Sequence, residues 1–119
     1  MKNMNILQKE YILAAEAHGA ATLEGDYEAA NKQYAKLTKY YKELEKNGPN
    51  ARSFLEDLFQ HRNASVRVWA AAHALGLGVQ TDEAQRVLQQ LSEDHKIGII
   101  RLDAEMTLKQ WTKNGRLKF

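Results

Sequence analysis

The stretch LEDLFQHRNASVRVWAAAHAL, residues 55–75, decides the fold that we predict for the whole chain. Leu55, Leu58 and Phe59 recur at helical spacing and predict an amphipathic helix. A short polar turn follows, in which Asn63 or Ser65 can cap a second, alanine-rich helix. Because the turn is short, the two helices are expected to pack as antiparallel neighbours.

Working outward from this hairpin, glycine and capping residues divide the chain into six predicted helices. Gly25 is expected to end the first helix, with Asp26 capping the second, and Gly48 to end the second helix. Thr81 is the predicted N-cap of the fifth helix. The six helices are expected at about residues 5–23, 27–46, 51–61, 64–77, 82–91 and 97–113.

The third and fourth helices are repeated in the fifth and sixth. Leu55 and Leu58 correspond to Leu88 and Leu91, an offset of 33 residues. The Arg67, Ala70 and Ala74 positions recur as Arg101, Ala104 and Leu108, an offset of 34 residues. A period of this length predicts stacked helical hairpins, each of which buries its apolar face against the next.

Three motifs carry a resemblance to known families: Gly25-Asp26-Tyr27 with Ala30-Asn31, VRVWAA at residues 66–71, and AEMTL at residues 104–108. Residues 51–113 resemble HEAT-like repeats, and the whole chain is similar to a bacterial family of small proteins catalogued as a domain of unknown function. The resemblance implies one all-α domain over residues 1–119. It would be a right-handed α-solenoid with an N-terminal hairpin and two HEAT-like hairpins. The resemblance implies no assigned catalysis, and similar proteins are suspected of serving as immunity proteins that neutralise a toxin. We therefore expect a non-enzymatic protein-binding module, an immunity-type or adaptor protein.

The repeated arginines also take their expected role from this resemblance. In HEAT-like repeats the arginine after the turn often pairs with an acidic residue of a neighbouring unit. Arg67 and Arg101 are therefore expected to be structural, with Asp57 and Asp103 as candidate partners. The alternative is that both face outward, where a guanidinium can grip a carboxylate or a phosphate.

Composition excludes several classes of protein. The 119 residues are 44% hydrophobic and 27% charged, and the formal net charge is only +2, so any nucleic-acid site would need a local basic patch. The sequence has no cysteine, which excludes disulfides. No apolar run approaches the roughly 20 residues of a membrane span, and the N-terminal residues do not resemble a secretory signal. We expect a cytoplasmic protein that does not contact a membrane.

No motif predicts an enzyme, a cofactor site or a metal site. The chain lacks a Gly-x-Ser-x-Gly elbow and a phosphate-binding glycine loop, and its histidines, at positions 18, 61, 73 and 95, lack metal-ligand spacing. His18 and His73 lie on apolar stripes and are expected in the core. Asp26 and Glu105 could join His18 in acid–base chemistry, but Asp26 is better explained as a cap and Glu105 as an ion-pair partner of Lys109.

The second helix has the clearest two-sided pattern. Its predicted core stripe is Tyr27, Ala30, Tyr34, Leu37, Tyr41 and Leu44, and its other side carries Lys32, Lys36, Lys39, Lys42 and Lys46. This lysine row is the basis of the alternative function, nucleic-acid binding. Glu28 and Glu43 interrupt the row and only Tyr40 is an aromatic residue among the lysines, so a solvated charged face is the favoured interpretation.

The sixth helix is apolar on two sides. Ile99, Leu102 and Met106 lie nearly opposite its core stripe, which predicts either a cover or an interface. Leu117 and Phe119 can fold back over this second face; otherwise a protein partner or a second copy of the chain would cover it, giving a homodimer. The predicted partner-binding residues are Arg67, Trp69, Ile99, Arg101, Glu105, Met106 and Trp111.

Overall fold

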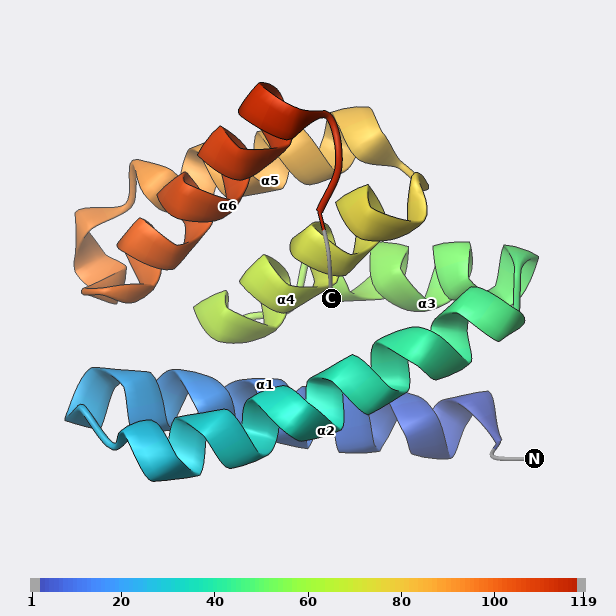
Figure 1. Cartoon of the computed structure of the whole chain (residues 1–119), viewed down its shortest axis with the longest axis horizontal. Coiled ribbons are helices and arrows are strands. Elements are labelled where there is room, and N and C mark those ends of the chain that lie inside the picture. Colours follow the sequence, from blue (N-terminus) through green and yellow to red (C-terminus); the bar gives the residue numbers. More distant parts are fainter. Residues whose placement is uncertain (1–2, 118–119) are drawn as a thin grey trace.

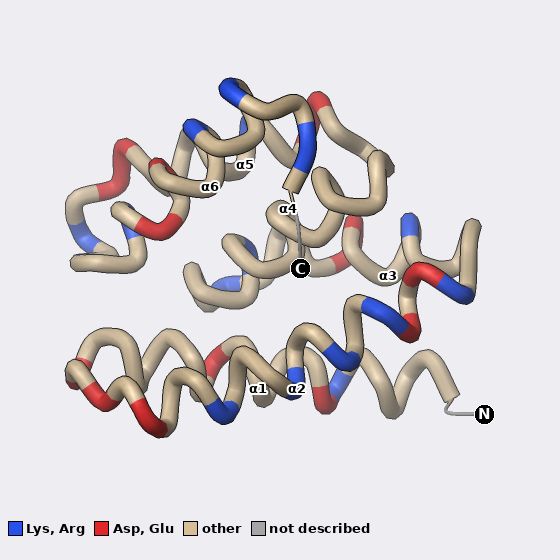
Figure 2. The backbone as a smooth tube through the Cα atoms, in the orientation of Figure 1, with Lys and Arg blue, Asp and Glu red and all other residues tan. Residues whose placement is uncertain are grey.

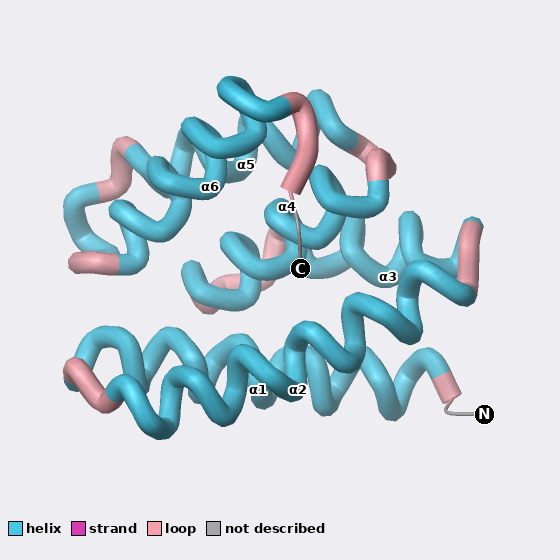
Figure 3. The backbone as a smooth tube through the Cα atoms, viewed as in Figure 1, coloured by secondary structure: helices cyan, strands magenta, loops and turns pink. Residues whose placement is uncertain are grey.

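The protein is all-helical in the part described by the computed structural model, residues 3–117 (Figures 1 and 3). The helices are α1 (Met4–Glu24), α2 (Tyr27–Lys46), α3 (Pro49–Leu58), α4 (Ala64–Leu77), α5 (Thr81–Ser92) and α6 (Ile100–Asn114), with a 3₁₀ turn, η1 (His95–Ile97), before α6. No strand occurs within this range. The predicted all-α class with six α-helices is therefore confirmed for these residues.

The helices form three hairpins that follow one another in chain order. In Figure 1, α1 and α2 form one layer, α3 and α4 lie in the middle, and α5 and α6 lie on the other side. Helix α4 contacts α1 on one side and α5 and α6 on the other, and it also packs against α3. The right-handed solenoid expected for such hairpins stays a prediction.

Helix α4 is the centre of the fold because it is apolar on nearly all sides. The sequence stripe predicted one buried face, which includes Trp69 and His73, and both of these are buried. Val68, Ala71 and Ala72, which lie outside that stripe, are buried as well. A helix that is apolar all round needs neighbours all round, which explains why four other helices contact α4.

Helix α1 packs tightly against α4 at Gly19. A Cβ atom added at Gly19 would lie 2.5 Å from Cβ of Ser65, so no larger residue fits unless the helices separate. Both residues are buried. The missing side chain of Gly19 thus allows α1 to contact the central helix directly.

A pair of buried polar side chains, Tyr11 of α1 and His73 of α4, joins these two helices in the core. A hydrogen bond of 2.7 Å joins the Tyr11 hydroxyl oxygen to Nδ1 of His73, and both residues have no exposed surface. Burial lowers the pKa of His73 to about 3, because the charged imidazolium would lose its hydration. The prediction of His73 as a core histidine is confirmed.

The capping predictions are right for α2 and α4 and wrong for α5. Asp26 accepts a hydrogen bond from the Ala29 backbone N–H, and Asn63, not Ser65, caps α4. Thr81 is the first residue of α5 rather than its cap, and Gln80 precedes it with a positive φ of 46°. Gln80 has this left-handed conformation, and its side chain makes no capping hydrogen bond to α5.

Further helix ends differ from the prediction, and glycines with positive φ lie beside most of them. Gly48, at φ 49°, precedes α3 rather than capping α2, whose C-cap is Asn47. Pro49 begins α3, where its missing N–H costs nothing, so this helix starts earlier than predicted and ends at Leu58. Gly98, at φ 61°, separates the 3₁₀ turn from α6, which begins at Ile100 rather than Ile97.

The predicted stripe of α2 is buried only in its C-terminal half. Leu37, Tyr41 and Leu44 are buried, whereas Tyr27 is 81% exposed and Tyr34 is 44% exposed. Tyr40, predicted to lie among the lysines, is instead 8% exposed, and its ring lies 6.5 Å from that of Tyr11. The lysine row therefore lacks its predicted aromatic residue.

Candidate functional site

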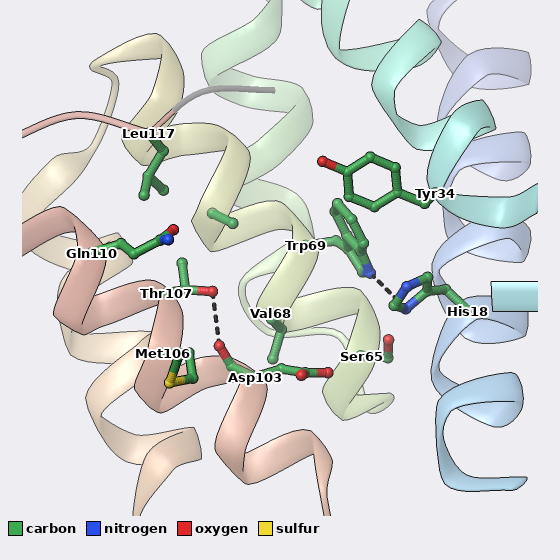
Figure 4. A pocket seen from close by; sticks show the side chains of 11 residues that line it. His18, Tyr34, Ser65, Val68, Trp69, Asp103, Met106, Thr107, Gln110 and Leu117 are labelled. Atoms are coloured by element: carbon green, nitrogen blue, oxygen red, sulfur yellow. Dashed lines mark hydrogen bonds between the residues drawn. The ribbon is translucent and has the colours of Figure 1, made fainter. Parts of the chain in front are cut away.

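A hollow in the surface lies between α2 and α6, with α1 and α4 as its floor. This hollow is a cleft of about 310 Å³. Tyr34 of α2, Trp69 and Val68 of α4, and Asp103 and Met106 of α6 contribute to its lining (Figure 4). These residues are far apart in the sequence, and the packing of α2 and α6 around α4 brings them together.

The aromatic part of the cleft is fixed by contacts of Trp69. Its ring lies 5.6 Å from that of Tyr34 and 5.0 Å from that of His18, both in edge-on arrangements. The indole Nε1–H donates a long hydrogen bond, 3.4 Å, to Nδ1 of His18. Because Nδ1 accepts, the proton of the neutral ring lies on Nε2. Burial lowers the pKa of His18, which further favours this neutral form.

Asp103 is the carboxylate of the cleft. Figure 4 shows its side chain extending from α6 toward Ser65 of α4. Thr107 donates a hydrogen bond of 2.8 Å to its backbone carbonyl. Burial raises the pKa of Asp103, because the ionised carboxylate loses part of its hydration. Within residues 3–117, no hydrogen bond or ion pair reaches this carboxylate.

Large apolar side chains stay exposed along both walls. Met106 is 60% exposed and Ile99 is 47% exposed. Ile99 and Tyr27 line a second hollow, of about 490 Å³, beyond the α1–α2 turn. Tyr27 and Tyr34 are seven residues apart on α2, and Ile99 and Met106 are seven residues apart at and within α6, so each pair shares a helix face. We call the surface flanked by these four residues the α2/α6 groove.

The predicted fold-back of the C-terminal tail covers only part of this groove. Leu117 is partly buried and lines the cleft together with Met106. Ile99, Leu102 and Met106 nevertheless remain exposed. Phe119, which was predicted to cover the same face, lies outside the described residues.

The seven predicted partner-binding residues do not form one surface. Trp69 and Met106 line the cleft, and Ile99 lines the second hollow. Arg101 and Glu105 lie on the other side of α6, beside α5, and Trp111 is partly buried against the core. Arg67 lies on α4, half-buried, and lines neither of the two hollows.

The repeated arginines do not make the predicted ion pairs with neighbouring units. Instead, Nη1 of Arg101 lies 3.8 Å from Oε2 of Glu105 on the same helix. Nζ of Lys109 lies 3.3 Å from Oε1 of the same carboxylate. The predicted Glu105–Lys109 pair is thus confirmed. Arg67 pairs with neither Asp57 nor Asp103, and its buried Nε has no hydrogen-bond partner among the residues described.

Asp26 and Glu105, the two candidates for acid–base chemistry with His18, do not line the cleft that contains His18. Asp26 caps α2, and Glu105 lies on the far side of α6. Asp103 and Ser65, which sequence reasoning assigned to other roles, share the cleft with His18 instead. The sequence contains one indication that Asp103 lies on the groove side of α6, namely its four-residue spacing from Ile99, which places both on one helix face. No sequence signal connected that face to His18.

Comparison with known proteins gives one result. The model of the family described as Domain of unknown function (DUF2019) matches residues 9–111. The chain belongs to this family. The DUF2019 region contains most or all of every helix around the groove and excludes the tail at Leu117. No curated protein and no solved structure matches the chain.

Among residues 3–117, no group of three or more histidine and acidic side chains is arranged to hold a metal ion. The helices of the same range include none with both the length and the apolar character needed to cross a bilayer.

Proposed function

We propose that this protein is a non-enzymatic protein-binding module, an adaptor or immunity-type protein, built on HEAT-like stacked hairpins. The α2/α6 groove is its binding surface. One observation carries this proposal: the exposed apolar side chains Tyr27, Tyr34, Ile99 and Met106 flank a recessed surface instead of being scattered singly. Clustered exposed apolar residues of this kind mark interaction sites.

The composition of the groove supports binding of a protein. Aromatic residues and methionine are enriched at the centres of protein interfaces, and Tyr34, Trp69 and Met106 meet in the cleft. The walls carry the aromatic and apolar side chains, whereas the ion pairs of α6 lie on its opposite side at Glu105. A partner that docks in the groove would therefore bury apolar surface without breaking those ion pairs.

The lysine row gives weaker support to the alternative, nucleic-acid binding. Its five lysines are exposed, but acidic and basic residues are interspersed along α2 (Figure 2). Tyr40, which would have stacked on bases, is buried. Phosphate binding along this helix would also lose affinity steeply with salt, whereas binding in an apolar groove would not.

The test is capture of a partner from a nuclease-treated native lysate with the tagged protein and two matched variants. Ile99→Asp places a charge in the groove outside the cleft, and Leu13→Asp places the same charge at a residue of α1 that is 66% exposed and lies outside both hollows. We expect one stoichiometric protein to be retained by the wild type and by Leu13→Asp and lost with Ile99→Asp. Burying the new charge should cost about 2 kcal/mol or more of binding free energy.

Two results would count against the proposal. A partner that binds Ile99→Asp as well as it binds the wild type would show that the groove is not the interface. Recovery of nucleic acid without nuclease, lost when Lys36→Glu and Lys39→Glu are combined, would favour the alternative function.

A further inference from the structure

The charge in the cleft is unbalanced. Asp103 is the one acidic residue in its described lining, which contains no lysine or arginine. The nearest basic residues of α6, Arg101 and Lys109, are on the opposite side of the helix and pair with Glu105. His18 does not supply a counter-charge, because its half-buried ring accepts a hydrogen bond from Trp69 and its lowered pKa favours the neutral form.

The rest of the lining suits the hydrocarbon stem and charged end of a basic side chain. Val68, Met106 and Leu117 offer apolar contacts, and the rings of Tyr34 and Trp69 stand at the wall and floor. Aromatic rings attract cations placed over their faces. The volume, about 310 Å³, is at the lower limit of ligand pockets, and it suits one long side chain rather than a whole helix.

We propose that the cleft receives a lysine or arginine side chain of the protein that docks in the α2/α6 groove, with the Asp103 carboxylate as its counter-ion. This inference rests on the proposed function and names the chemistry of the partner: an apolar segment with a basic residue at its centre. A purely apolar insert would remove more water from Asp103 without replacing its lost interactions, and an acidic insert would be repelled by it.

The ionisation of Asp103 agrees with this assignment. Burial raises the pKa of its carboxyl group in the free protein, since nothing in the described cleft compensates the lost hydration. A bound cation would stabilise the ionised form and bring that pKa back down. Charge-assisted hydrogen bonds of this type are among the strongest that proteins make.

The experiment uses the purified full-length protein and three small probes that differ only in their polar end: n-butylammonium, n-butylguanidinium and n-butanol. Binding is followed by NMR titration at the Trp69 indole N–H, which Trp111→Phe distinguishes from that of Trp111, and at the carboxyl carbon of Asp103. We expect both cations to shift these signals to saturation, to bind about tenfold more tightly than the alcohol, and to lower the pKa of Asp103.

Two variants make the result specific. Asp103→Asn keeps the shape of the side chain and should reduce binding of the cations to that of n-butanol. Glu105→Gln removes the same charge from the opposite side of α6 and should leave binding of the cations unchanged. If Asp103→Asn folds poorly, the comparison of the cations with n-butanol on the wild-type protein still tests the inference.

Three results would overturn the inference. If the alcohol binds as tightly as the cations, the cleft takes an apolar insert. If none of the probes shifts these signals, the cleft does not receive a cation. If concentration-dependent broadening at Trp69 is removed by Ile99→Asp, a second copy of the chain covers the cleft. The probe titration is separable from the capture experiment. Cation binding with no partner loss in Ile99→Asp would show that the cleft binds a cation and would refute the groove as the interface.

Discussion

Lowering the pH from 7 to 5 should destabilise the fold through His73. The side chain has no exposed surface, and its pKa in the native state is about 3 against an ordinary value of 6.5. Below pH 6.5 the unfolded chain therefore takes up a proton that the folded protein does not accept until the pH approaches 3. The state that binds more protons gains stability as the pH falls, so unfolding becomes easier in this range.

The size of the effect follows from the two pKa values. Between pH 7 and pH 5 the linkage relation gives a loss of about 2 kcal/mol from His73 alone. This is a large share of the roughly 5–15 kcal/mol that stabilises an ordinary domain. Most carboxylates keep their charge at pH 5, which limits their contribution to the change.

The assay compares urea unfolding at the two pH values for the wild type, His73→Gln and His95→Gln. Glutamine can still accept a hydrogen bond from Tyr11, whereas His95 is exposed and serves as the control. His73→Gln should remove about 2 kcal/mol of the pH-dependent loss, and His95→Gln should leave it unchanged. Contributions from His18 and Asp103 are common to all three proteins and cancel. Equal losses in the wild type and His73→Gln would refute the reasoning.

Three further substitutions test the packing and the surface. Gly19→Ala should lower the free energy of unfolding, measured in urea, by up to about 2 kcal/mol. Overpacking against Ser65 costs about 1–3 kcal/mol, which exceeds the helix-propensity gain of about 1 kcal/mol. A stabilised variant would contradict the close contact. Asn63→Ala removes the acceptor for the Val66 N–H and should lower the free energy of unfolding in urea by about 1 kcal/mol. An unchanged urea midpoint would show that this cap is dispensable. Glu105→Gln should change the free energy of unfolding by less than about 1 kcal/mol, because the two ion pairs of Glu105 are partly exposed. A larger loss of stability in calorimetry would reveal a stronger network of ion pairs.

Helix positions could be predicted from the sequence because their signals are local. Asp26 and Asn63 cap helices through hydrogen bonds to residues three positions ahead, so the relevant atoms are close in the sequence. The breaks at Gly48 and Gly98 were harder to place. A glycine with positive φ can end one helix or precede the next, and the pattern alone does not distinguish these two roles.

The candidate site was predictable only in part. Ile99 and Met106 were assigned to an unpaired apolar face from their spacing on one helix, and both are exposed. Asp103 shares that face, but its meeting with His18 and Trp69 could not be inferred. These three residues belong to three helices whose relative placement depends on contacts between distant segments.

By itself, the sequence determined six helices, the caps Asp26 and Asn63, and the buried histidine of α4, because periodicity and capping act over a few residues. Only the tertiary structure decided which apolar faces are covered. Tyr27 and Tyr41 lie on the same predicted stripe, yet Tyr27 is 81% exposed and Tyr41 is buried. A helix pattern fixes the side on which apolar residues lie, whereas their burial depends on whether another helix reaches that side. The N-terminal half of the α2 stripe borders the groove instead, where Tyr27 lines the second hollow and Tyr34 lines the cleft.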